Sequence, residues 1–136
     1  MANVEVKKVD RFSVEVPNEA GQGAGVLGAI SAGKADLLAA WGYPYGDRAK
    51  IELIPADAAA FKAAAKNAKI TVKKEGAAFC VGGRNKVGAL AEVMGMLAAA
   101  GVNVHAVQAI GMGGKFGALV EVEAKDLRKA SKALGV

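Results

Sequence analysis

The stretch Asn18-Glu19-Ala20-Gly21 returns 67 positions later as Asn85-Lys86-Val87-Gly88, and the repeat that contains it decides the fold. The same offset superposes Phe12 on Phe79, while near the ends an offset of 66 places residues 4–8 on residues 70–74. A self-similar segment of this length is one supersecondary unit used twice. Since the second copy stops before its own last strand, we expect the N-terminal strand to supply the missing piece.

The apolar pattern gives each copy the same order of elements. Phe79 and Val81 alternate with small residues, and the strand that begins at Phe116 alternates in the same way. Between them, apolar residues recur at helical spacing: Val87, Leu90, Met94 and Leu97. Each copy thus follows the order strand, strand, helix, strand, strand, helix. This predicts an α+β chain of two tandem ferredoxin-like (βαββαβ) modules, each an antiparallel sheet with its helices on one face.

The module boundaries follow from the offset, and the leading strands can be arranged in two ways. We expect a first module at residues 1–68 and a second at residues 69–136. Strands 4–8 and 70–74 either form hairpins within their own copies or are exchanged between the modules. The hairpins would turn at residues 9–11 and at Glu75-Gly76, and they keep the inward residues on one face. The sequence does not decide between hairpins and exchange.

Composition restricts the classes of function. The chain has 18 basic and 13 acidic side chains, and its lysines are spread along the sequence, which is typical of a solvated rim. No apolar run reaches the ~18 residues of a membrane span, and the single cysteine, Cys80, excludes an internal disulfide. We therefore expect a cytoplasmic protein without membrane or nucleic-acid partners. No metal-ligand cluster, phosphate loop or catalytic triad occurs, so we expect no cofactor and no enzyme activity.

The segment from Gly82 to Leu90 stands out as a candidate site. It joins a glycine-rich turn to a helix start, where free backbone amides and the positive end of the helix dipole suit a carboxylate. In the alternative interpretation, Asn85 only caps the helix and the glycines only turn the chain.

This segment resembles the ACT domain family, which consists of small regulatory modules that bind amino acids. The resemblance rests on Asn85-x-x-Gly88-x-Leu90 after a strand, followed by the segment 97–104, in which Asn103 opens the next strand. It covers the chain as two tandem modules. The first module departs from the pattern, because Gly23 stands where Leu is expected and Asp36 where Asn is expected.

The resemblance implies that an amino acid lies where two modules meet. The first loop of one module and the second strand of its neighbour would hold it, which pairs the Asn85 loop with Asp36 and the Asn18 loop with Asn103. Because Asp36 is charged and Asn103 is not, we expect two sites of unequal affinity. The resulting candidate ligand-binding residues are Asn85, Lys86, Val87, Gly88, Asp36, Asn18, Glu19, Ala20, Gly21 and Asn103.

Three other functions compete with this one. The chain could be a protein-interaction module with a vestigial ligand site, and its aromatic hairpin at residues 41–45 could be a partner patch, a lid or ordinary strand packing. An acylphosphatase, a fold neighbour that uses an arginine and an asparagine, is a weaker alternative. Arg84 and Asn85 are adjacent in this chain rather than on separate elements. RNA binding would need aromatic side chains on the open sheet face, where the alternation places none.

As partners we expect a small amino acid or related metabolite, a regulated enzyme or regulator protein, and a second copy in a homodimer.

Overall fold

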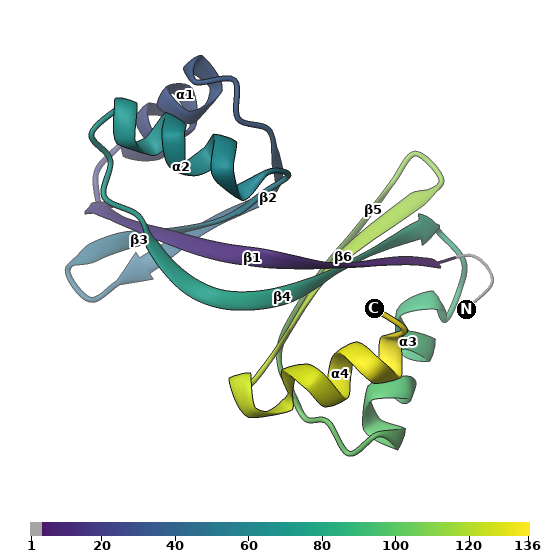
Figure 1. Ribbon diagram of the computed structural model, residues 1–136. Coiled ribbons are helices and arrows are strands. Elements are labelled where there is room, and N and C mark those ends of the chain that lie inside the picture. The colour runs from purple at the N-terminus through teal and green to yellow at the C-terminus, as the bar shows by residue number, and fades with distance from the viewer. Residues whose placement is uncertain (1–3) are drawn as a thin grey trace. The chain divides into compact units, whose positions relative to one another are not determined.

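The computed structural model describes residues 4–136 and has an α+β fold with antiparallel strands and four α-helices (Figure 1). By contact density the chain divides into a first unit, Asp10–Gly76, and a second unit that combines the residues up to Val9 with Ala77–Val136. The elements in chain order are β1 (Val4–Pro17), α1 (Gln22–Ala32), β2 (Leu37–Tyr45), β3 (Arg48–Pro55), α2 (Ala58–Asn67), β4 (Lys73–Arg84), α3 (Ala89–Ala99), β5 (Val104–Met112), β6 (Lys115–Val122), a 3₁₀ turn (Ala124–Asp126) and α4 (Leu127–Leu134).

In the first unit, α1 and α2 cover one face of β2, β3 and the second half of β1 (Figure 1). β3 pairs with both β1 and β2, so Phe12 of β1 lies beside Leu53 of β3. The rings of Phe12 and Phe61 approach to 5.0 Å between centroids, which joins the strand to α2 in a buried core. The helix α2 begins where the Asp57 carboxylate accepts the backbone N–H groups of the first turn.

In the second unit, α3 and α4 cover β4, β5 and β6, with β6 between the other two strands. Phe79 and Val120 are fully buried partners across β4 and β6, as the alternation predicts. The predicted apolar stripe of α3 is correct for Leu97, which is buried, and for Leu90, which packs on the core, and it is wrong for Val87. The helix α3 buries Ala89, Val93 and Leu97, while Val87 lies before the helix and is fully exposed.

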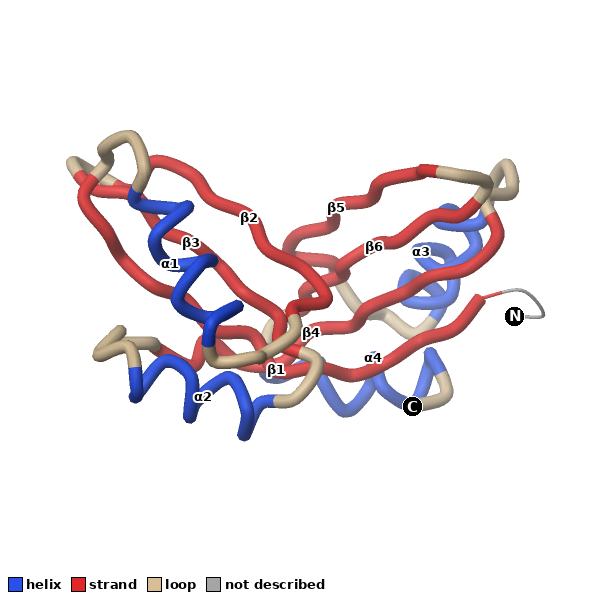
Figure 2. The backbone as a smooth tube through the Cα atoms, turned by 90° about the horizontal axis from the view of Figure 1, so that it is seen from above, coloured by secondary structure: helices blue, strands red, loops and turns tan. Residues whose placement is uncertain are grey.

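The strands β1 and β4 are each continuous through the positions where the hairpin turns were expected (Figures 1 and 2). Neither predicted hairpin turn exists, since residues 9–11 lie within β1 and Glu75-Gly76 within β4. At Gly76 the strand continues with φ 131°, a backbone angle that favours glycine.

Each leading segment packs against the core of the other copy of the repeat. Val4 and Val6 pack on the core of the second unit, whereas Ile70 and Val72 pack on the core of the first. Each unit therefore contains a segment from the other half of the sequence, as an exchange of the leading strands predicts.

The repeat is also visible in the backbone angles. Eight of the ten described residues with positive φ form pairs at the offsets found in the sequence, 67 through most of the chain and 66 at the end, while Gly76 and Gly114 have no counterpart. The pairs are Gly21 and Gly88 (89° and 85°), Lys34 and Gly101 (59° and 75°), Gly46 and Gly113 (64° and 60°), and Lys69 and Gly135 (59° and 77°). The two copies thus turn at the same places even where their residues differ.

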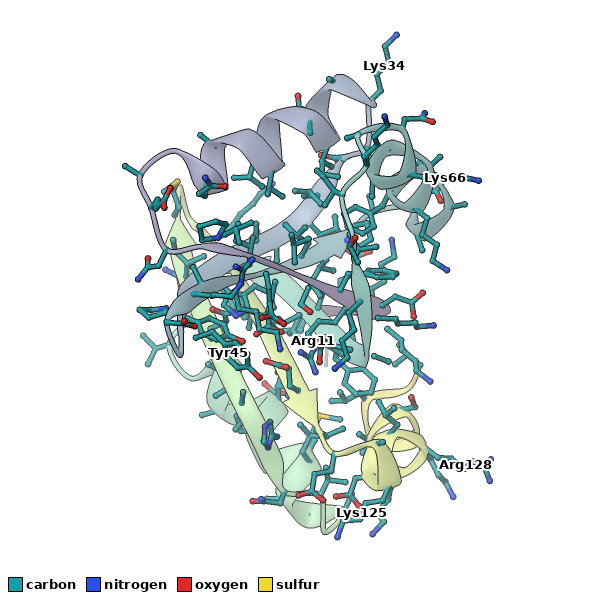
Figure 3. The ribbon with its side chains drawn as sticks, turned by 90° about the vertical axis from the view of Figure 1, so that its left-hand side faces the viewer. Arg11, Lys34, Tyr45, Lys66, Lys125 and Arg128 are labelled. Atoms are coloured by element: carbon teal, nitrogen blue, oxygen red, sulfur yellow. The ribbon has the colours of Figure 1, made fainter. Side chains whose placement is uncertain are left out.

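Basic side chains are spread over both units. Lys34 and Lys66 project outward from the first unit, as Lys125 and Arg128 do from the second (Figure 3). Among residues 4–136, no helix has the length and hydropathy to span a bilayer.

Candidate ligand-binding site

The loop between β4 and α3 places an uncapped helix start at the end of a strand. Gly88 occupies the N-cap position with φ 85° and makes no side-chain cap. The loop is closed by backbone bonds from the Ala89 N–H to the Lys86 carbonyl (3.1 Å) and from the Glu92 N–H to the Gly88 carbonyl (3.0 Å). Gly88 rather than Asn85 occupies the cap position, so the expectation that Asn85 caps the helix is wrong. Since glycine has no side chain, the next amides of the first turn can serve an external acceptor.

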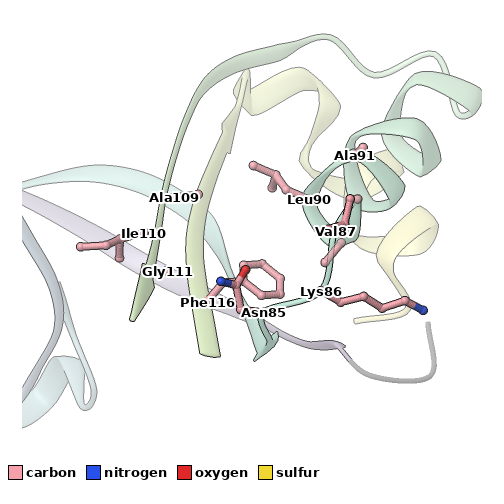
Figure 4. A pocket seen from close by; sticks show the side chains of 11 residues that line it. Asn85, Lys86, Val87, Leu90, Ala91, Ala109, Ile110, Gly111 and Phe116 are labelled. Carbon is pink, nitrogen blue, oxygen red and sulfur yellow. The ribbon is translucent and has the colours of Figure 1, made fainter. Parts of the chain in front are cut away.

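A cavity of about 440 Å³ opens at this loop, and all of its lining residues belong to the second unit (Figure 4). Its walls come from the loop, the first turn of α3, the far end of β5 and the start of β6. The lining residues are Asn85, Lys86, Val87, Gly88, Ala89, Leu90, Ala91, Ala109, Ile110, Gly111 and Phe116. The lining is mainly apolar with a few polar groups, which is typical of small-molecule sites.

Asn85 is held by the hairpin that joins β5 and β6. Its backbone N–H donates to the carbonyl of Gly114 at 2.9 Å. Its side chain lies over Gly111, where a Cβ atom would stand only 3.0 Å from Nδ2 of Asn85. A glycine at position 111 therefore leaves room for the amide, and any larger residue would displace it. Figure 4 shows the Asn85 amide beside Phe116, while the Lys86 side chain extends away from both.

The first unit has the same loop backbone but different side chains around it. Gly21 caps α1 with φ 89°, and the Gly25 N–H donates to the Gly21 carbonyl at 2.9 Å. At the offset of 67, however, the walls change: Gly23 stands for Leu90, Ala49 for Phe116 and Pro44 for Gly111. The first loop thus keeps the backbone amides and lacks the bulky apolar residues that shape the cavity of the second unit.

The structure brings together only part of the predicted site. Asn85, Lys86, Val87 and Gly88 line the cavity, and Asn103 of the same unit precedes β5 outside the lining. Asp36, exposed just before β2, and the loop Asn18-Glu19-Ala20-Gly21 belong to the first unit. Whether these residues meet the second unit's loop stays a prediction.

The residues that β5 and β6 contribute to the cavity were not among the predicted site residues. Ala109, Ile110 and Gly111 belong to the strand that Asn103 opens, and Phe116 was assigned only to the core. The one sequence signal is Gly111 itself, because a glycine next to a strand end often marks a close backbone approach.

The first unit carries a polar network on the strand positions where the second unit is apolar. Glu52, 6% exposed, accepts from Tyr43 Oη at 2.6 Å and pairs with Arg11. Burial, the hydrogen bond to Glu52 and its negative charge together raise the pKa of Tyr43 to about 12. At the offset of 67, Glu52 corresponds to Leu119 and Tyr43 to Ile110. Tyr43 is therefore part of strand packing rather than a free aromatic patch.

A second polar contact holds the start of β4 in the first unit. Ser13 Oγ donates to Glu75 Oε1 at 2.7 Å, and Lys50 Nζ lies 3.4 Å from the same oxygen. The Ser13 hydrogen bond, more than the ammonium groups of Lys50 and Lys73, lowers the pKa of Glu75. Among the described residues no group of three or more His, Cys, Asp or Glu side chains could hold a metal ion.

Antiparallel strands with two helices on one face are the arrangement that the resemblance implies, and solved structures of low sequence identity share this fold over nearly the whole chain. Protein BT0572 from Bacteroides thetaiotaomicron matches 96% of this chain and 88% of its own, with 20% identity and a TM-score of 0.78. The ligand-free regulatory subunit of aspartate kinase from Thermus thermophilus matches 98% of this chain and 95% of its own, with 16% identity and a TM-score of 0.61.

The regulatory subunit of aspartate kinase from Thermus flavus gives a similar result, with 14% identity, a TM-score of 0.61 and the same coverage, 98% of this chain and 95% of its own. No family model and no curated protein matches the sequence. Both Thermus structures are regulatory subunits of aspartate kinase.

Proposed function

We propose that this chain is a regulatory protein that binds a small amino acid or a related metabolite, built from two ACT-like modules in tandem. The modules correspond to residues 1–68 and 69–136 with their leading strands exchanged. The observation that carries the proposal is the cavity of about 440 Å³ at the uncapped start of α3. The regulatory role of the similar aspartate kinase subunits supports it.

The chemistry of the cavity fits a small carboxylate. The amides of Leu90 and Ala91 lie in the first turn of α3, where neither Gly88 nor any other side chain caps them. A carboxylate there would receive hydrogen bonds and the positive end of the helix dipole. The Asn85 side chain lines the same cavity, and Leu90 and Phe116 offer apolar contact for the body of the ligand.

We infer that the second unit holds the stronger of two unequal sites. The loop of the first unit has the same backbone but lacks the bulk that Leu90 and Phe116 supply. The pairing of the Asn85 loop with Asp36, and of the Asn18 loop with Asn103, stays a separate prediction, which the carboxylate and apolar contacts of the cavity do not require. If an Asp36→Asn variant bound amino acids as strongly as the native chain, the predicted pairing with Asp36 would be wrong.

A melting-temperature screen of the common amino acids with the intact chain tests the function. We expect at least one of them to raise the melting temperature, since a ligand that binds only the folded state stabilises it. Asn85→Ala should weaken that shift strongly, and Asn18→Ala at the equivalent loop should weaken it less. No shift with any amino acid would contradict the proposal.

A second candidate is a protein-interaction module whose output requires a partner. The observation in its favour is a run of exposed apolar side chains on β5 of the second unit: Val107, Ile110 (67% exposed) and Met112 (77% exposed). A regulated enzyme, a regulator protein or a second copy of this chain would suit such a strand. Failure of the amino-acid screen together with concentration-dependent association would favour this candidate.

A further inference from the structure

The cavity of the second unit contains groups for a carboxylate and an apolar chain but no acidic group for an ammonium. Among the described residues that line it, Lys86 is the one ionisable side chain, and neither Asp nor Glu contributes. The Lys86 ammonium points away from Asn85 and Phe116 (Figure 4). A site that depends on an α-ammonium ordinarily offers a carboxylate, because hydrogen bonds between opposite charges are roughly twice as strong as neutral ones.

The polar side chain that does face the cavity is neutral and can act in both directions. The amide of Asn85 carries an acceptor, Oδ1, and a donor, Nδ2. Both lie within 4 Å of the Cβ position of Gly111, Nδ2 at 3.0 Å and Oδ1 at 3.7 Å. A half-turn of the amide exchanges them. Oδ1 can then accept from an ammonium, and Nδ2 can donate to the oxygen of an oxo or hydroxyl group.

Resting on the proposed function, we propose that this cavity binds aliphatic 2-oxo and 2-hydroxy acids about as well as the amino acid with the same side chain. The carboxylate would lie at the first turn of α3, the aliphatic chain against Leu90 and Phe116, and the substituent at the second carbon against Asn85. The site would then report on an amino acid and on the 2-oxo acid that transamination interconverts with it.

The test uses valine, 3-methyl-2-oxobutanoate and isobutylamine with the intact chain, each followed by titration calorimetry. We expect dissociation constants for the first two within about tenfold of each other, the difference that one net hydrogen bond allows. Isobutylamine, which has the ammonium and the chain but no carboxylate, should not bind.

An Asn85→Asp variant sharpens the test by placing a carboxylate where the amide lies. The variant should weaken the binding of 3-methyl-2-oxobutanoate at least tenfold relative to the binding of valine. The new carboxylate repels the carboxylate of the oxo acid, and the amide donor for its oxo group is lost. Asn67→Asp, at an exposed amide on α2 outside the cavity lining, is the matched control and should leave the ratio of the two dissociation constants unchanged.

The outcomes separate this inference from the proposed function. Binding of valine without 3-methyl-2-oxobutanoate would overturn the inference and leave amino-acid sensing standing. If Asn85→Asp left the ratio of the dissociation constants of 3-methyl-2-oxobutanoate and valine unchanged, the role given to the Asn85 amide would be wrong. If valine and the oxo acid both fail while the screen finds other amino acids, the apolar selectivity is wrong. If no amino acid binds, the proposed function fails as well.

Discussion

Gly111 positions the Asn85 amide, which makes it the most informative single residue of the site. In Gly111→Ala the new Cβ would meet Nδ2 at 3.0 Å and push the amide out of place. An off-rotamer side chain costs about 1 kcal/mol, so we expect amino-acid binding to weaken about fivefold with little loss of folding stability. Calorimetry and thermal unfolding measure the two effects. Gly117→Ala on the neighbouring strand, where a Cβ would meet nothing within 4 Å, should change neither.

Tyr43 stabilises the first unit through its hydrogen bond to the buried Glu52. Tyr43→Phe removes the 2.6 Å bond and leaves the carboxylate with one donor fewer, so we expect a loss of about 1 kcal/mol in the free energy of unfolding. Urea unfolding measures it. Tyr45→Phe on the same strand keeps its ring against Lys50 and should have almost no effect. In an ultraviolet titration Tyr43→Phe should also lose the ionisation near pH 12.

At the scale of elements, Glu75 ties the start of β4 to the first unit and makes its stability sensitive to acid. Since the folded pKa lies below the ordinary 4.5, the carboxylate contributes its full stability above pH 4.5. That contribution is lost as the pH falls from 4.5 through the lowered folded pKa. We expect the free-energy difference between the native chain and Glu75→Gln to be constant from pH 7 to 5 and to shrink below pH 4.5. Urea unfolding at a series of pH values checks this, and a difference that grew in acid would contradict it.

The faces of strands and helices could be predicted from the sequence, and their connections could not. Phe79 and Leu97 are buried as expected because period-two and helical patterns report directly on burial. A hairpin at Glu75-Gly76 and a continuous β4 satisfy the same alternation, so the pattern could not separate them. Gly76 favoured a turn by composition, whereas in the structure its positive φ lets the strand continue.

The site was predictable only where it is local in sequence. Asn85 and Gly88 lie in one loop with a recognisable pattern. Gly111 and Phe116 reach the cavity through the pairing of β5 with β6, where the two residues are partners. No short-range spacing encodes such a contact. Glu52 was missed for a related reason, since its neighbours Tyr43 and Arg11 lie on two other strands.

At the scale of the whole molecule, the folding units differ from the sequence repeats. The first unit is Asp10–Gly76, whereas the first copy of the repeat, residues 1–68, lacks the packing of Ile70 and Val72. We therefore expect a fragment of residues 10–76 to unfold cooperatively by circular dichroism, and a fragment of residues 1–68 to show weak or no cooperativity. Equal stability of the two fragments would contradict strand exchange.

The measurement that tests the central claim most directly is titration calorimetry of the intact chain with the amino acid that raises its melting temperature most. We predict that the site in the second unit binds more strongly than any site in the first. Asn85→Ala should remove this stronger site, and the matched variant Asn18→Ala should leave it in place. Because the first loop lacks the walls given by Leu90 and Phe116, any second site should be weaker. Two identical sites, or a stronger site that survives Asn85→Ala and disappears in Asn18→Ala, would contradict it.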